Sequence, residues 1–135
     1  MEHPSFSTDI DVMFYDTDAG GVVHNIAYLR FIEFARTKLA ARLDHDIRAC
    51  AEKQIYAVVT RTEIDYLKPA RLGETIVVTA RLAGVDRARF YIESIITHKG
   101  DGRKLVACRQ TLALVRLPEA KVQPVPEAWR ALFAN

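Results

Sequence analysis

The sequence has few of the features that mark secreted, membrane-spanning or redox proteins. Its two cysteines, Cys50 and Cys108, stand far apart and match no metal or redox spacing, so we expect two free thiols. The first ten residues carry acidic side chains and no apolar stretch of a signal peptide. No apolar run approaches the roughly 20 residues of a membrane-spanning helix. These absences predict a cytoplasmic protein without membrane insertion.

Charge of one sign is also scarce, because 19 basic and 17 acidic residues leave a net charge of only +2. The two signs are interspersed, whereas a nucleic-acid binder usually concentrates Lys and Arg on one face or in one tract. We therefore expect no nucleic-acid partner. The 135 residues show no repeat, linker or low-complexity segment, so residues 1–135 are interpreted as one domain long enough to bury a core.

Hydrophobic periodicity predicts one strand, one long helix and then four long strands. The helix is expected over 26–43, with Asn25 as its N-cap. Its apolar residues wrap most of the circumference, which is typical of a helix packed on several sides. Residues 44–53 form a polar connection, and the tail from 126 to 133 predicts one short helix. The expected strands are 8–15, 56–67, 74–84, 87–99 and 104–117.

This order favours an α+β fold, in which an antiparallel β-sheet wraps around one long central α-helix. The strand over 56–67 alternates with a period of two, and we expect its even positions to share one face: Tyr56, Val58, Thr60, Thr62, Ile64 and Tyr66. So few strands cannot enclose the helix, and open sheet edges invite association. Pairing two such sheets edge to edge predicts a homodimer or homotetramer.

The chemistry concentrates in residues 14–28. Asp16 and Asp18 flank Thr17, and Gly20 and Gly21 allow the backbone to approach a ligand closely. The apolar helix begins immediately afterwards, and its first amide groups have no intrahelical acceptor. A helix start of this kind presents donors and a positive dipole end to a developing oxyanion. A carboxylate, a close-approach loop and an oxyanion-accepting helix end are the parts that thioester hydrolysis needs.

Other interpretations of the same residues stay open at this point. Asp, Thr and Gly before a helix are also ordinary turn and capping residues. His24 fits either a partly exposed loop residue or a general base. A metal site built from Asp16, Asp18 and His24 lacks a second recognisable ligand pair, and the remaining histidines are scattered. We therefore expect neither a metal nor another cofactor.

The run YDTDAGGVVHNIAYLRFIEFARTKLAARL resembles the opening of the 4-hydroxybenzoyl-CoA thioesterase family of hotdog proteins. Within that family it is most similar to the acyl-CoA thioesterases associated with the bacterial Tol-Pal system. The segment DYLKPARLGETIVV resembles the junction between the second and third strands of that subfamily. The resemblance covers about residues 8–117. It implies a single hotdog domain that hydrolyses a small aliphatic or aromatic acyl-CoA to the free acid and CoA.

The resemblance also assigns roles to particular residues. Asp18 would be the catalytic carboxylate, and the backbone amide of Asn25 would polarise the thioester carbonyl. Tol-Pal-associated relatives carry a His at the position of Asn25, so any acid–base role of that side chain would be lost here or pass to His24. The pocket would be lined by the second strand of a partner copy, around Val59, Thr60 and Arg61. Basic candidates for the CoA phosphates are Arg71, Arg87 and Arg89.

Two rival functions share this evidence. A hotdog hydroxyacyl dehydratase needs a His together with an acid, and such enzymes usually carry the acid in the central helix. Here the helix offers only Glu33, on its polar stripe. A non-catalytic acyl-CoA-binding or scaffold protein is the second rival, and the intact Asp18 argues against it.

Overall fold

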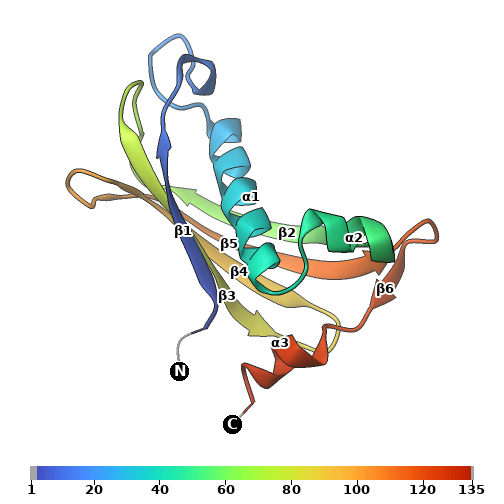
Figure 1. Cartoon of the computed structure of the whole chain (residues 1–135). Coiled ribbons are helices and arrows are strands. Elements are labelled where there is room, and N and C mark those ends of the chain that lie inside the picture. The colour runs from blue at the N-terminus through green and yellow to red at the C-terminus, as the bar shows by residue number, and fades with distance from the viewer. Residues whose placement is uncertain (1–2, 135) are drawn as a thin grey trace.

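The computed structural model describes residues 3–134 and shows an antiparallel sheet that curls around one long helix (Figure 1). The strands are β1 (Ser5–Asp11), β2 (Ile55–Tyr66), β3 (Thr75–Val85), β4 (Phe90–His98), β5 (Lys104–Arg116) and β6 (Lys121–Gln123). Their order in the sheet is β1-β3-β4-β5-β2, and β6 pairs with β5. The predicted α+β arrangement is confirmed. The helices are the 3-10 turn η1 (Phe14–Asp16), α1 (Asn25–Arg42), α2 (Ile47–Lys53) and α3 (Glu127–Ala131).

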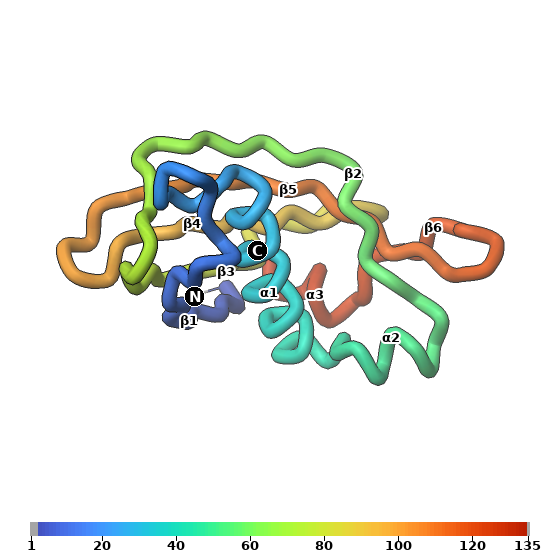
Figure 2. Tube along the Cα trace, turned by 90° about the horizontal axis from the view of Figure 1, so that it is seen from above, coloured from blue at the N-terminus to red at the C-terminus, as the bar shows by residue number. Residues whose placement is uncertain are grey.

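Helix α1 packs over one half of the sheet. Its buried side chains include Phe31, Ile32 and Leu39, and the helix contacts β3 and β1 (Figure 2). The opposite side of α1 leaves Ile26 and Leu29 exposed. Within one chain the helix is therefore not packed on several sides, contrary to the prediction. The helix contacts mainly β3 and β1, and a trough made of two hollows separates its other side from parts of β2 and β5.

Two predicted boundaries at the start of the chain are wrong. The first strand ends at Asp11 instead of residue 15, because the chain turns into η1, where the Asp16 carboxylate accepts a bond from the Met13 N–H (2.9 Å). Helix α1 begins at Asn25, and His24 is its N-cap instead of Asn25. The His24 Nδ1 accepts a hydrogen bond from the Ala27 N–H (3.3 Å), which satisfies one of the free amides of the first turn.

A β-bulge interrupts β2, so the side chains that face inward are at odd positions before the bulge and at even positions after it. The pairing with β5 shifts register between Val59 and Arg61, so Thr60 is the extra residue. Val59 and Thr62 both line the hollow beside α1, so residues of different parity face the helix on the two sides of the bulge. The prediction that all even positions share one face is consequently wrong for Tyr56 and Val58, which lie on the other side of the bulge.

The remaining elements follow the predicted order, with two additions. The four predicted strands that follow α1, which are β2 to β5, are confirmed to within three residues at each end. Helix α2 occupies the predicted polar connection, and the short strand β6 was not predicted. The tail helix is shorter than expected, and its Trp129 is buried and donates to the Leu43 carbonyl (3.2 Å). Within residues 3–134, no helix combines the length and apolar character needed to cross a bilayer.

Candidate active site

The loop of residues 12–24 lies at one end of the molecule, beyond the start of α1 (Figure 1). It is hydrogen-bonded to residues 70–74, in the connection between β2 and β3. The Val12 N–H donates to the Glu74 carbonyl (2.9 Å), and the Val23 N–H donates to the Ala70 carbonyl (2.9 Å). The Leu72 N–H in turn donates to the Gly21 carbonyl (3.0 Å). Both ends of the loop are thus bonded to residues 70–74.

Asp16 is buried inside this loop, with only 3% of its surface exposed. Its carboxylate accepts the Met13 N–H and forms an ion pair with Arg30 (3.4 Å). Its main-chain carbonyl accepts the His24 N–H (3.1 Å). These bonds tie the start of the loop to the start of α1, so Asp16 shapes the loop.

Asp18 is exposed, two residues further on. One carboxylate oxygen, Oδ1, accepts the Gly20 N–H (2.9 Å). Among residues 3–134, no other group bonds to this carboxylate, so Oδ2 faces solvent. Gly20 permits the close approach, because an added Cβ there would lie 3.4 Å from Oδ1. Gly21 has a φ of 74°, which favours glycine, and it completes the turn that presents Asp18.

The start of α1 lies beside this turn. An isolated bridge pairs Thr17 with Val23, so the segment that carries Asp18 runs antiparallel to the segment entering the helix. The Asn25 N–H sits at the first helical position, where no intrahelical acceptor exists. No hydrogen bond between described residues uses it. A hollow next to Asn25 is lined by Val23, Tyr28, Tyr66, Lys68 and Pro69. A solvent-facing carboxylate and a free helix-start amide therefore share one end of the molecule.

Two tyrosines support the helix start. The buried Tyr28 hydroxyl accepts the Ala70 N–H (2.9 Å), and burial raises the pKa of Tyr28, with the Ala70 bond opposing the shift. The Tyr66 hydroxyl donates to the Asn25 carbonyl (3.4 Å). Neither tyrosine was predicted as a residue of the site. Tyr28 sits in an apolar helical pattern that looks like core, and its partner is 42 residues away, so only the fold reveals the contact.

His24 has its Nδ1 engaged as the helix cap. In this geometry the neutral ring carries its proton on Nε2, and Nδ1 is not free to act as a base. Asp16, Asp18 and His24 do not form a metal-binding group: in the part of the chain that the structure describes, no cluster of three or more His, Cys, Asp or Glu side chains could hold an ion.

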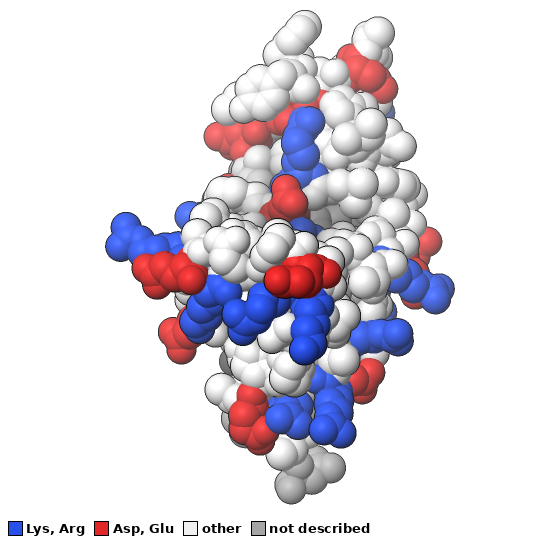
Figure 3. All heavy atoms as spheres, turned by 90° about the vertical axis from the view of Figure 1, so that its right-hand side faces the viewer, with Lys and Arg blue, Asp and Glu red and all other residues white. Residues whose placement is uncertain are grey.

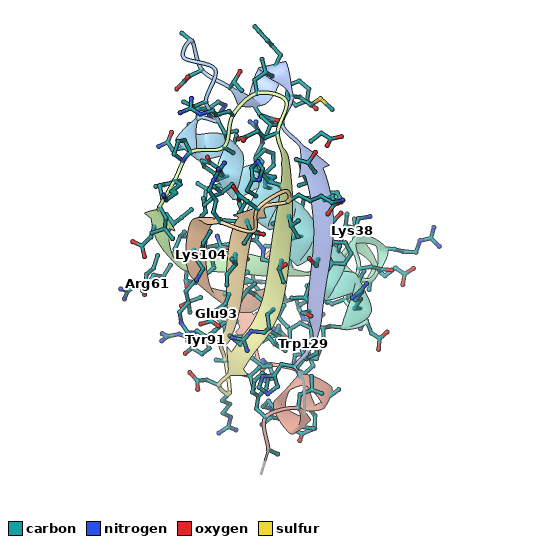
Figure 4. The ribbon with its side chains drawn as sticks, turned by 90° about the vertical axis from the view of Figure 1, so that its left-hand side faces the viewer. Lys38, Arg61, Tyr91, Glu93, Lys104 and Trp129 are labelled. Atoms are coloured by element: carbon teal, nitrogen blue, oxygen red, sulfur yellow. The ribbon has the colours of Figure 1, made fainter. Side chains whose placement is uncertain are left out.

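The predicted substrate-binding residues of β2 are split by the bulge. Val59 faces the trough beside α1, and the Thr60 hydroxyl donates to the Thr111 carbonyl (3.1 Å). Arg61 lies on the outer face, projects away from the molecule (Figure 4) and pairs with Glu63 (2.9 Å). These residues stand five to seven positions before Tyr66 on β2, roughly 17–23 Å along the strand from the residue that bonds Asn25.

The three predicted phosphate-binding arginines occupy opposite ends of the sheet. Arg71 forms an isolated bridge with Val22 and so lies beside the candidate loop. Arg87 and Arg89 lie in the turn after β3, the full length of that strand away, or roughly 35 Å. One chain does not bring them together. Lys68, which the sequence analysis missed, lines the hollow at Asn25. On the face displayed in Figure 3, basic and acidic side chains are intermixed.

Comparison with known proteins shows the family to which the chain belongs. Residues 12–133 match the family described as the thioesterase-like superfamily, and the chain belongs to that family. The predicted hotdog fold is confirmed by the same match and by a 1,4-dihydroxy-2-naphthoyl-CoA thioesterase from Synechocystis. The two structures superpose with a TM-score of 0.83 at 21% identity, over 94% of this chain and 93% of the other.

Particular relatives are similar over most of the chain. The acyl-CoA thioesterase YbgC of Haemophilus influenzae is 31% identical over 95% of this chain and 93% of its own length. The 1,4-dihydroxy-2-naphthoyl-CoA hydrolase of Thermosynechococcus vestitus is 32% identical over 87% of this chain and 83% of its own. A probable thioesterase from Bartonella henselae has a TM-score of 0.77 at 26% identity, covering 91% of this chain and 99% of the other.

Proposed function

We propose that this protein is an acyl-CoA thioesterase that hydrolyses a small aliphatic or aromatic acyl-CoA to the free acid and CoA. The observation that carries the proposal is that the solvent-facing Asp18 carboxylate and the free Asn25 N–H lie on neighbouring segments at the same end of the molecule. The named activities of the curated relatives support it. The finer likeness to 4-hydroxybenzoyl-CoA and Tol-Pal-associated thioesterases belongs to the same proposal, as does a cytoplasmic location.

In the proposed reaction, the thioester carbonyl oxygen accepts the Asn25 N–H. The helix start stabilises the negative charge that develops on this oxygen in the transition state. Asp18 either attacks the carbonyl carbon or removes a proton from the attacking water. Both routes break the same C–S bond, consume one water and release the acid and the CoA thiol. His24 supports the amide by capping its helix, and Asp16 keeps the loop in shape.

The proposed assembly is a homodimer, or a homotetramer made of two dimers. The edge strand β2 is exposed along most of its length, and the apolar Ile26, Leu29, Val58 and Val59 lie exposed beside it. Antiparallel pairing of two β2 edges would cover them and place Val59 and Thr60 of a partner copy near the Asn25 end. Light scattering should detect dimers or tetramers at micromolar concentration. A stable monomer there would contradict this assembly.

The activity test measures thiol release from a panel of aliphatic and aromatic acyl-CoA esters. Asp18→Asn keeps the size of the side chain but removes the charge, so turnover should fall by at least about a hundredfold. The melting temperature should stay the same, because the side chain is exposed. Asp16→Asn is the matched control, with a smaller loss that acts through loop geometry.

Other outcomes separate the rivals. Enoyl-CoA hydration without thiol release would identify a dehydratase, and binding of the esters without either reaction would identify a scaffold protein. Normal turnover in Asp18→Asn combined with loss in Asp16→Asn would reverse the roles of the two carboxylates. If neither change alters turnover, the proposed site is wrong.

A further inference from the structure

A trough runs along the side of α1 that faces β2, and it consists of two adjoining hollows. The first begins at Ile26, directly after Asn25, and continues past Leu29 and Val59. The second is an apolar cavity of about 200 Å³ between the later half of α1, the sheet and α2. Trp129 of α3 belongs to its lining. Both hollows are lined by Glu33 and Arg36, so these two residues stand midway along the trough.

Arg36 is the buried member of this pair, with 17% of its side chain exposed. Its Nη1 donates to the Gln110 Oε1 (2.5 Å), and the Gln110 Nε2 donates to the Thr62 hydroxyl (3.2 Å). Gln110 is itself buried, so the guanidinium is held in place against β5. This chain of bonds orients Arg36 but supplies no negative charge to balance it.

The only carboxylate paired with Arg36 among residues 3–134 is that of Glu33, 3.5 Å from Nη2. The Glu33 side chain is 67% exposed, so solvent screens most of this attraction. Burial lowers the pKa of Arg36, with Glu33 opposing the shift. A largely buried cation whose only carboxylate partner is exposed is incompletely compensated for the hydration that it has lost. Arg36 lines both hollows.

We propose that Arg36, positioned by Gln110, binds a carboxylate at the far end of the acyl group. The planar guanidinium matches a carboxylate through two parallel hydrogen bonds, which a desolvated trough strengthens. The substrate class is then an ω-carboxyacyl-CoA, the half-thioester of a dicarboxylic acid. This inference rests on the proposed thioesterase function and refines its substrate.

The length of the acyl group follows from the helix geometry. Arg36 comes 11 residues after Asn25, a rise of roughly 16 Å, and helical side chains lean back toward the N-terminus. The guanidinium therefore lies roughly 10 Å from the carbonyl-binding amide, which suits a chain of about six to eight carbons. Apolar Ile26 and Leu29 would contact the methylene groups between the two ends.

The test compares suberyl-CoA with octanoyl-CoA, which have the same chain length and differ in the terminal carboxylate. The native enzyme should favour suberyl-CoA in kcat/KM. Arg36→Met keeps the aliphatic arm and should reduce the suberyl-to-octanoyl ratio on the order of tenfold to a hundredfold. Lys38→Met is the matched control, because Lys38 is an exposed cation of the same helix, over the Phe34 ring and outside the trough. Its ratio should equal that of the native enzyme.

Other results would overturn the carboxylate site at Arg36. A native preference for octanoyl-CoA, or an equal loss on both esters in Arg36→Met, would overturn the inference and leave the thioesterase proposal intact. If no ester in the panel releases CoA, the proposed function itself fails. Should Arg36→Met not fold, free suberate and octanoate are compared as inhibitors of the native enzyme. Suberate should act at about tenfold lower concentration, and equal inhibition by the two acids would refute the carboxylate site.

Discussion

The loop of residues 12–24 and the interface between α1 and β3 are held together by different forces. In the loop, the chain is held by main-chain hydrogen bonds to residues 70–74 and by the buried carboxylate of Asp16. At the interface, apolar side chains such as Ile32 and Leu82 are fully buried. One hydrogen bond contributes about 1 kcal/mol net, whereas burying one large aliphatic side chain contributes about 1.5–3 kcal/mol. Changes in the loop should therefore alter turnover, and changes at the interface should alter stability.

The largest expected effect is on stability, from Ile32→Ala. Ile32 has no exposed surface, and the truncation removes buried contacts and leaves a cavity against the sheet. The free energy of unfolding should fall by about 2–5 kcal/mol. Chemical denaturation measures this loss, while kcat per folded molecule should change little. Lys38→Ala, on the exposed side of the same helix, should change neither quantity. If Ile32→Ala lowered kcat without lowering stability, it would contradict the assignment of turnover to the loop and of stability to the interface between α1 and β3.

A second prediction concerns Glu74, which supports the loop from outside. Its Oε1 accepts the Arg71 N–H (2.7 Å), and its Oε2 lies 2.9 Å from the His98 Nε2. The same Oε2 also pairs with the Arg103 Nη2 (3.4 Å). Glu74→Ala removes all three contacts from the connection to which the loop is bonded, so kcat should fall by about tenfold with little change in KM.

The matched variant is Glu74→Gln, which keeps an acceptor for the Arg71 N–H and should restore most of kcat. Steady-state kinetics of both variants, with their melting temperatures, check this expectation. If the Ala and Gln variants lose the same activity, the contact with Arg71 does not position the loop.

The third prediction concerns CoA binding and extends the comparison to the two ends of the sheet. Arg71→Ala, beside the loop, should raise KM about threefold to tenfold with kcat unchanged, the signature of lost uniform binding. The dependence of KM on salt should also weaken, because exposed charges are screened.

Arg87 and Arg89 lie at the other end of the sheet, in the turn between β3 and β4. Arg87→Ala and Arg89→Ala should raise KM only if a neighbouring copy brings that turn to the site. In a variant that remains monomeric, neither substitution should therefore change KM. Unchanged KM in all three single variants would move the nucleotide site elsewhere.

The smallest expected effect concerns His45, which lies far from the loop, against Trp129. Burial lowers the pKa of His45, with Lys53 adding to the shift and Asp46 opposing it. The folded state then binds fewer protons than the unfolded state just below the ordinary pKa of about 6.5. Stability should therefore be complete above that pH and decrease as the pH falls through the lowered pKa. Denaturation at several pH values checks this, and His45→Gln should flatten the dependence within that window.

The sequence alone determined the order of the elements and indicated a candidate site. A period of two and a wrapped apolar helix depend on neighbours in the chain, so β2 to β5 and α1 were predicted to within a few residues. The turn with the sequence D-T-D-A-G-G, directly before a helix, is also recognised from neighbouring residues alone. Its resemblance to a thioesterase family pointed to Asp18 and to the amide of Asn25 before any contact was known.

The tertiary structure decided what depends on pairing between distant segments. The bulge at Thr60 appears only when β2 is aligned with β5, and it turns Val59 inward and Arg61 outward. His24 replaces Asn25 as the cap because the chain is already helical at Asn25, and the His24 ring accepts the Ala27 N–H. The burial of Arg36 against Gln110 joins residues 74 positions apart. Such contacts follow from the register of strands and the packing of the helix, which local patterns do not specify.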